Sequence, residues 1–190
     1  MDKDNFLRIT SVVIDYLEGG YYHPRMKVGM KLSDQKIMGD SGETMFGLDR
    51  KHGAQLAKYP EWTQFWHIID NAQPPYWKHY DRGGILEPKL KLLTAKIMYQ
   101  WFTELAGKYL NADAVAAIAN DDRLILHFSY AAWNGEGWFK RFATALNKAV
   151  TYHPGDKEAI WQQAIKARTE SSNKVIRQQG ANMLKAVEKL

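Results

Sequence analysis

The sequence contains no cysteine, which excludes disulfide bonds, thiolate catalysis and cysteine metal ligands. No apolar stretch approaches the roughly 20 residues that a helix needs to cross a bilayer. Residues 1–8 carry charges of both signs and lack the apolar core of a Sec signal peptide. We therefore expect a chain without a transmembrane segment, made in the cytoplasm without a signal peptide.

Two common chemical signatures are also missing. The six histidines show no metal-binding spacing, and no glycine-rich loop is followed by the Gly-Lys-Ser/Thr of a phosphate site. We therefore expect neither a metal ion nor a cofactor. His127 lies in an almost wholly apolar stretch, so we expect a hydrogen-bonded core residue rather than a ligand.

The composition is rich in aromatic rings and mildly basic. Aromatic residues make up 13%, including seven Trp and ten Tyr, and such rings build cores and also stack on sugars. The net charge is +5, with no run of like charges. A dispersed basic surface suits nucleic acid, anionic lipid or bacterial cell wall, and by itself does not choose among them.

Helical periodicity dominates the chain, and period-2 alternation is absent except for a short ribbon expected within residues 21–48. We predict a mainly α, single domain over residues 1–190, with a helical C-terminal part from about residue 85. Helices are expected from an Asp4 cap to Leu17, within Lys51 to Ala57, from Pro60 to before Pro74, from Pro88 to Gly107, from an Asn111 cap to Ala119, over 124–133, from Trp138 to Ala149, after an Asp156 cap, and after a Ser172 cap.

The first helix carries the most suggestive acid. Phe6, Ile9, Val13 and Leu17 form its apolar row, and Glu18 follows directly before a Gly-Gly break. A carboxyl at a helix C-terminus lies near partial negative charge, which together with burial would raise its pKa. Such an acid could donate a proton to a leaving group.

A second polar turn over residues 39–47 supplies candidate partners. It contains Asp40, Glu43 and Thr44. Glycosidic cleavage needs an acid at the leaving oxygen and a second polar group that places water or stabilises the cationic transition state. Rings that could stack on sugar faces lie nearby in the sequence: Tyr21, Tyr22, Tyr76, Trp77 and Tyr80.

Four segments in this order resemble glycoside hydrolase family 108. They are residues 18–21 (Glu-Gly-Gly-Tyr), residues 39–48 with a glycine-flanked Asp and a Thr before Phe-Gly-Leu, residues 76–77 (Tyr-Trp), and residues 131–135 (Ala-Ala-Trp-Asn-Gly). Members of that family are N-acetylmuramidases with a lysozyme-like fold, found as phage endolysins and as bacterial proteins called secretion activators.

The resemblance implies a lysozyme-like hydrolase that cleaves the β-1,4 bond between N-acetylmuramic acid and N-acetylglucosamine in peptidoglycan. It implies Glu18 as the catalytic acid, with Asp40 and Thr44 as catalytic partners. Substrate contacts are expected from Tyr21, Tyr22, Glu43, Phe46, Tyr76, Trp77 and Asn134, the last of which could instead cap a helix end facing the cleft. We expect a monomer that binds glycan strands but no nucleic acid, and acts at the cell wall or periplasm after release or export.

The chain departs from the family pattern in its second segment. The insert before Asp40 is longer, Met45 replaces the usual Asn, and Glu43 competes with Asp40 for the second carboxylate role. Two alternatives therefore stay open: a wall-binding or secretion-apparatus protein that has lost turnover, and a lytic transglycosylase or chitosanase-like enzyme.

Overall fold

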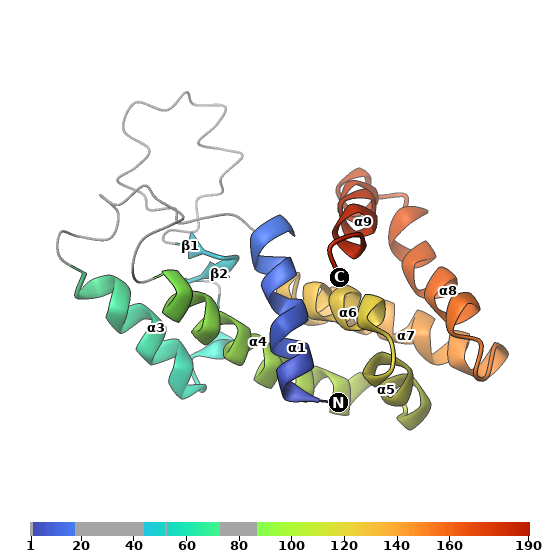
Figure 1. Ribbon diagram of the computed structural model, residues 1–190, viewed down its shortest axis with the longest axis horizontal. Helices are drawn as coiled ribbons and strands as arrows, with labels where there is room; N and C mark the ends of the chain where they lie inside the picture. Colours follow the sequence, from blue (N-terminus) through green and yellow to red (C-terminus); the bar gives the residue numbers. More distant parts are fainter. Residues whose placement is uncertain (1, 18–43, 52, 73–86) are drawn as a thin grey trace. The chain divides into compact units, whose positions relative to one another are not determined.

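The computed structural model describes residues 2–17, 44–51, 53–72 and 87–190. This part of the chain is mainly α-helical with a small antiparallel ribbon, which confirms the predicted fold class (Figure 1). The chain divides into two compact units, one of residues 1–17 and 98–190 and the other of residues 18–97. A single domain over residues 1–190 stays a prediction.

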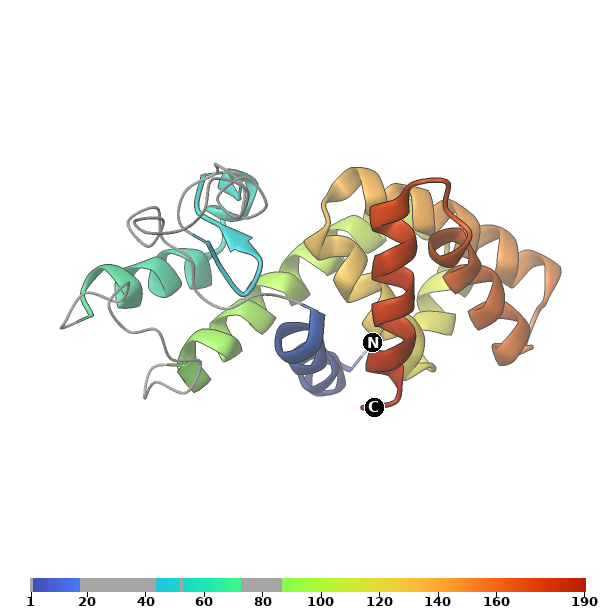
Figure 2. The same cartoon turned by 90° about the horizontal axis from the view of Figure 1, so that it is seen from above.

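The larger, helical unit is built around α6 (Asp122–Trp133), whose residues 124–132 are all buried. Helices α1, α5, α7, α8 and α9 pack on it, and α8 and α9 lie side by side (Figure 2). The elements of this unit are α1 (Lys3–Val12), the π-helix η1 (Val13–Leu17), the second half of α4 (Glu87–Tyr109), α5 (Ala112–Ala119), α6, α7 (Glu136–Tyr152), α8 (Lys157–Thr169) and α9 (Lys174–Val187).

Side-chain caps fix most helix starts in this unit. Asn111 and Asp156 accept backbone N–H groups at the starts of α5 and α8, which confirms both predicted caps. Two other predicted caps are wrong by one or two residues. Asp2 and not Asp4 caps α1, because the Asp2 carboxylate accepts the free backbone N–H of Asp4. Asn173 and not Ser172 caps α9, because the side-chain oxygen of Asn173 accepts the free backbone N–H groups of Val175 and Ile176.

Gly107 does not end α4, contrary to the sequence prediction. The helix continues through it to Tyr109. A glycine inside a helix costs about 1 kcal/mol relative to alanine, which the packing of a long helix readily offsets. Trp101 shows this packing, since its indole N–H donates to the carbonyl of Ala132 in α6 at 3.2 Å.

Four phenylalanines join four helices in the core of the helical unit. Phe6 of α1 contacts Phe102 of α4 at 5.1 Å between ring centroids, Phe102 contacts Phe139 of α7 at 5.8 Å, and Phe139 contacts Phe128 of α6 at 5.5 Å. All four rings are at most 4% exposed. Their tilted and edge-on contacts are the geometries that aromatic quadrupoles favour.

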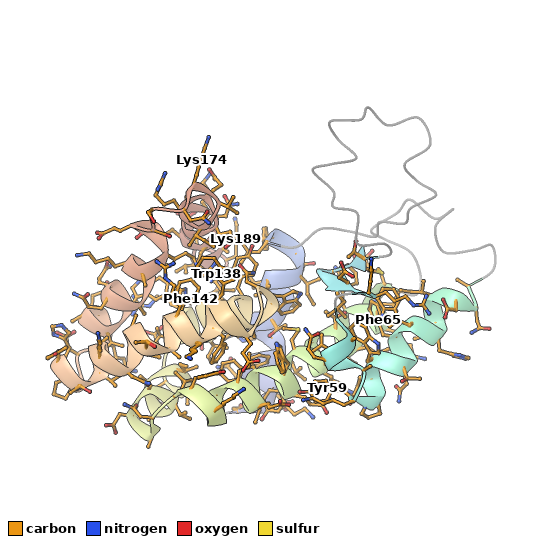
Figure 3. All side chains as sticks on the ribbon, turned by 180° about the vertical axis from the view of Figure 1, so that it is seen from behind. Tyr59, Phe65, Trp138, Phe142, Lys174 and Lys189 are labelled. Carbon is orange, nitrogen blue, oxygen red and sulfur yellow. The ribbon has the colours of Figure 1, made fainter. Side chains whose placement is uncertain are left out.

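The same unit also buries a cation and an imidazole. Arg168 of α8 is fully buried, with its guanidinium 4.5 Å from the Phe142 ring and 5.0 Å from the Tyr130 ring. One of its N–H groups donates to Gln179 at 3.0 Å, and burial lowers its pKa to about 10. The ring of Trp138, one turn earlier in α7, stacks on that of Phe142 (Figure 3).

His127 is a core residue, as predicted, but the predicted hydrogen bond is wrong. The ring is fully buried among Phe128, Phe142 and Trp161, and neither nitrogen has a hydrogen-bond partner in the described residues. Burial and, secondarily, the charge of Arg168 hold the pKa of His127 well below its usual value. The imidazole is therefore neutral at neutral pH.

The smaller, ribbon-containing unit consists, in its described part, of a hairpin, a short 3₁₀ turn and two α-helical segments. Strands β1 (Thr44–Met45) and β2 (Leu48–Asp49) are followed by the 3₁₀ turn η3 (Ala54–Leu56), α3 (Pro60–Asp70) and the first half of α4. Helix α3 starts at Pro60 as predicted, just after Tyr59, and buries Phe65, whose ring lies edge-on to that of Trp66 at 5.0 Å between centroids (Figure 3). Within the described residues, no helix is long and apolar enough to span a membrane.

Candidate functional site

Most of the predicted site lies outside the described residues. This is so for Glu18, Asp40, Glu43, Tyr21, Tyr22, Tyr76, Trp77 and Tyr80. Thr44 and Phe46 lie on the hairpin of the ribbon-containing unit, and Asn134 lies in the helical unit. The structure therefore bears on the site through these three residues and through the segments that lead into the other positions.

The segment that leads to Glu18 is a π-helix, not the continuous α-helix that the sequence predicts. Its five residues, Val13–Leu17, follow α1 without a break and end one residue before Glu18. The insertion of one residue per turn shifts the apolar row, so Leu17 is half-buried while Val13 is fully buried. Single π turns within helices occur often at functional sites.

The π-helix is held by the C-terminal part of the chain. It packs on α6 and α9, and the ammonium of Lys189 lies 5.9 Å from the centroid of the Tyr16 ring. Val13 and Ile14 anchor its inner side in the core. The end of the chain thus supports the segment that leads to the predicted acid.

Thr44 and Phe46 belong to a tight hairpin with a two-residue turn. Thr44 pairs with Asp49, and Met45 pairs with Leu48. Phe46 and Gly47 form the turn with φ of 51° and 73°, as the type I′ turn of two-residue hairpins requires. Gly47 adopts this conformation freely, but a bulky residue such as Phe46 is strained there.

The strained ring is buried rather than presented to solvent. Phe46 is 3% exposed, and the ammonium of Lys91 lies 6.0 Å from its ring centroid. Strain of this kind costs on the order of 1–3 kcal/mol and persists where surrounding contacts impose it, often beside a functional site. A substrate contact from Phe46 stays a prediction, while its packing in the interior of this unit is present in the structure.

Helix α3 fixes the far end of the hairpin. Arg50 makes a bidentate pair with Asp70, with both N–O distances 2.7 Å, and its guanidinium lies 4.9 Å from the Trp66 ring. The hydrogen bonds from Arg50 hold the pKa of Asp70 below its usual value. Gly53 lies so close to Trp62 that a Cβ there would stand 2.4 Å from the ring. The hairpin is thereby held against helix α3.

Sequence reasoning missed an acid near the hairpin. Glu87, in the first turn of α4, is 4% exposed and pairs with Lys91 at 2.9 Å. Its second carboxylate oxygen is buried and has no hydrogen-bond partner among the described residues. Lys91 therefore links a buried carboxylate to the Phe46 turn. In the sequence, Glu87 is an ordinary first-turn acid before Pro88, a pattern that gives no sign of its burial.

Asn134 caps a helix end. Its side-chain amide donates to the carbonyl of Tyr130 at 3.0 Å, and its backbone N–H also bonds in the last turn of α6. Gly135 follows with φ of 97° and starts α7. Of the two roles considered for Asn134, capping is therefore present in the structure, and substrate contact stays a prediction.

A second polar cluster beside this turn was also missed. Glu136, the first residue of α7, accepts hydrogen bonds from Lys108 and from the phenol of Tyr109 at the end of α4. The ammonium of Lys140 lies 5.8 Å from the centroid of the Tyr109 ring. These bonds lower the pKa of Glu136, with the bond from Lys108 contributing most. An ionised Glu136 thus ties the ends of α4 and α7 together.

The described part of the chain contains no cluster of side chains that could coordinate a metal ion. No group of three or more His, Asp or Glu side chains there could hold a metal ion.

Comparison with protein-family models, with curated proteins and with solved structures finds no match to this chain.

Proposed function

We propose that this protein is a peptidoglycan hydrolase, an N-acetylmuramidase that cleaves the β-1,4 bond between N-acetylmuramic acid and N-acetylglucosamine. Glu18 serves as the general acid that protonates the leaving oxygen. Asp40 and Thr44 place the water or stabilise the positive charge that develops on the sugar ring. Resemblance to glycoside hydrolase family 108 over four ordered segments is the basis in sequence.

The observation that carries the proposal is the π-helix that ends at Leu17. A π turn is less stable than an α turn and persists where something else is gained. Here it immediately precedes Glu18, the residue to which the sequence assigns the chemistry. It also packs on α6 and α9, so the chain approaches Glu18 from a fixed helix and not from a loose loop.

The hairpin gives independent support. Thr44 lies on β1 directly before the strained Phe46–Gly47 turn, and Arg50 and Trp66 tie the hairpin to α3. A catalytic threonine needs a backbone that does not drift, since misplacement by about 1 Å can cost a hundredfold in rate.

The test is cleavage of purified peptidoglycan by the wild type and by Glu18→Gln. The substitution keeps the size of the side chain and removes the transferable proton, so the rate is expected to fall on the order of 10²–10⁴-fold or more. Glu188→Gln is the matched control, because Glu188 is an exposed C-cap glutamate of α9. A Glu18→Gln protein that clears the wall near the wild-type rate would overturn the proposal.

Two further measurements separate the alternatives. Reducing ends on the fragments indicate hydrolysis, while anhydro ends indicate a lytic transglycosylase. A wild-type protein that sediments with peptidoglycan but releases no fragments is a wall-binding protein and not an enzyme. For the second carboxylate, we expect Asp40→Asn to abolish cleavage and Glu43→Gln to reduce it less; the reverse order would reassign the role.

A further inference from the structure

An ion pair on α4 is buried more deeply than is usual for a pair on a helix surface. The side chain of Glu87 is 6% exposed and that of Lys91 is 31% exposed, whereas both partners of the equally spaced pair Lys166–Glu170 on α8 are more than half exposed. One Glu87 oxygen lies 2.9 Å from the Lys91 ammonium, and the other is buried without a hydrogen-bond partner among the described residues. A buried ion pair with an unsatisfied oxygen adds little to stability, so stability alone does not explain it.

Lys91 connects this carboxylate to the hairpin. Its ammonium also lies 6.0 Å from the centroid of the Phe46 ring, within the range in which the negative face of a ring attracts a cation. Lysine has a long, flexible side chain, and holding it in one conformation has an entropic cost. The bond to Glu87 limits this freedom and keeps the ammonium beside the ring. The carboxylate therefore acts on the hairpin through the lysine.

The turn centred on Phe46 decides which way Thr44 faces. The described ribbon pairs Thr44 with Asp49 and Met45 with Leu48 around this turn. A two-stranded hairpin is marginally stable by itself, and a slip of one residue in register moves every side chain to the opposite face. In the observed register Met45 is buried and Thr44 is partly exposed. A slip would therefore bury the threonine and remove it from the site proposed above.

The turn needs contacts that hold the Phe46 side chain, because its backbone is strained. A φ of 51° is unfavourable for a bulky residue and persists only where the surroundings impose it. The ring is 3% exposed, and the Lys91 ammonium lies beside it. If the ring were released, the backbone could relax to a negative φ, and the type I′ turn that sets the register would be lost.

We propose that Glu87 and Lys91 are positioning residues for the muramidase reaction. Glu87 holds the Lys91 ammonium against the Phe46 ring, and this contact keeps the hairpin in the register that presents Thr44 to the substrate. Neither Glu87 nor Lys91 touches the substrate. The inference rests on the proposed function, because Thr44 is a residue of that site. Its structural part, control of the hairpin by an ion pair on α4, is measurable without any activity.

The structural part is tested by NMR on the full chain, through the NOE contacts between the paired residues Met45 and Leu48. Glu87→Gln and Lys91→Met should weaken these contacts and add a second set of hairpin signals. Lys91→Arg should retain them, because a guanidinium also binds a carboxylate and stacks on a ring. The double variant Glu87→Gln/Lys91→Met leaves neither charge of the pair without its partner, which avoids misfolding caused by an isolated buried charge. Wild-type contacts in the double variant overturn the proposal.

The positioning role is tested by kcat and KM on soluble peptidoglycan fragments. Glu87→Gln, Lys91→Met and the double variant should each lower kcat by about 5- to 50-fold and change KM by less than about twofold, because a displaced threonine costs rate more than binding. The three losses should be similar, since the two residues act as a unit. Glu170→Gln and Lys166→Met, in the exposed pair of α8, are the matched controls and should leave kcat unchanged. Losses that multiply in the double variant, or a change in KM alone, overturn the positioning role.

This inference and the proposed function fail in different ways. If the wild type cleaves peptidoglycan and Glu18→Gln does not, while Glu87→Gln/Lys91→Met cleaves at the wild-type rate, the positioning role is overturned and the muramidase proposal stands. If Glu18→Gln cleaves like the wild type, or the wild type does not cleave, the muramidase proposal fails together with the assignment of the pair to that reaction. The NOE contacts still decide in that case whether the ion pair controls the hairpin.

Discussion

The two units of the molecule are stabilised in different ways. The helical unit consists of regular helices with side-chain caps. Its unusual feature is that two polar side chains, Arg168 and His127, are buried in its core. The described part of the ribbon-containing unit also buries a carboxylate, that of Glu87, but its particular feature is a tightly held backbone, at Phe46 and at Gly53. Buried charge costs stability over a whole core, whereas backbone strain is local. The comparison therefore points to the hairpin as the place where geometry, and not stability, has been favoured.

The largest effect is expected at Gly53, where the ribbon-containing unit has no room for a side chain. In Gly53→Ala the new Cβ would stand 2.4 Å from Trp62 and 2.6 Å from the Asp49 carbonyl. A shift of backbone is then unavoidable, and we expect the free energy of unfolding to fall by about 2–4 kcal/mol. Urea unfolding followed by tryptophan fluorescence measures it. Wild-type stability in this variant would show that the hairpin is not held as tightly as the comparison claims.

The second effect tests the buried polarity of the helical unit. The folded-state pKa of His127 lies well below the unfolded value of about 6.5, so between these two pKa values the unfolded chain binds a proton that the folded chain does not. Stability contributed by His127 is thus complete above pH 6.5 and is lost as the pH falls, at about 1.4 kcal/mol per pH unit.

The matched variant for this effect is His127→Leu, which removes the titrating group. We expect the wild type to lose about 2 kcal/mol more than His127→Leu between pH 6.5 and pH 5, measured by urea unfolding at each pH. Parallel pH profiles of the two proteins would mean that the imidazole is not buried as described.

The third effect concerns the order of two substitutions at the hairpin turn. Glycine usually destabilises a protein relative to alanine, but at φ of 51° alanine is strained and glycine is not. We expect Phe46→Gly to be more stable than Phe46→Ala by about 0.5–1 kcal/mol, although both lose the buried ring. At Leu48, on the paired strand β2, the usual order should return. Alanine above glycine at both positions would remove the evidence for strain.

The smallest effect is expected at Gly107, in the helical unit, where the comparison predicts the opposite sign to Gly53. A Cβ at Gly107 would meet nothing within 4 Å. Gly107→Ala should raise the free energy of unfolding by about 0.5–1 kcal/mol through helix propensity. Gly180→Ala is the intermediate case, because its Cβ would stand 3.0 Å from the Thr169 side chain and 3.2 Å from the Thr169 backbone, and we expect these close contacts to offset the gain from helix propensity.

Sequence reasoning predicted the helical unit well because its signals are local. Asn111 and Asp156 mark helix starts through single side chains, and the apolar stretch of α6 identifies a buried helix without knowledge of its neighbours. The errors at Asp4 and Ser172 are shifts of one or two residues among several oxygens that could each cap a helix.

The candidate site was less predictable because its features depend on long-range packing. Nothing in the residue type of Phe46 announces a positive φ, which the two-residue hairpin imposes. The burial of Glu87 depends on the fold around it, and a π turn leaves no distinct apolar period over five residues. Glu18, Asp40 and Thr44 were found through motif resemblance and not through periodicity.

The π-helix at Val13–Leu17 has a consequence for how this chain could change. A π turn contains one residue more than the α turn it interrupts but completes nearly the same rotation, because each of its residues turns the chain by less than the roughly 100° of an α residue. Deleting one residue from it would therefore restore the α period and leave the direction of the helix end nearly unchanged. The buried side chains of Phe6, Ile9 and Val13, which precede or begin the π turn, would stay packed in the core. The segment can therefore absorb the loss of one residue without repacking of the helix before it.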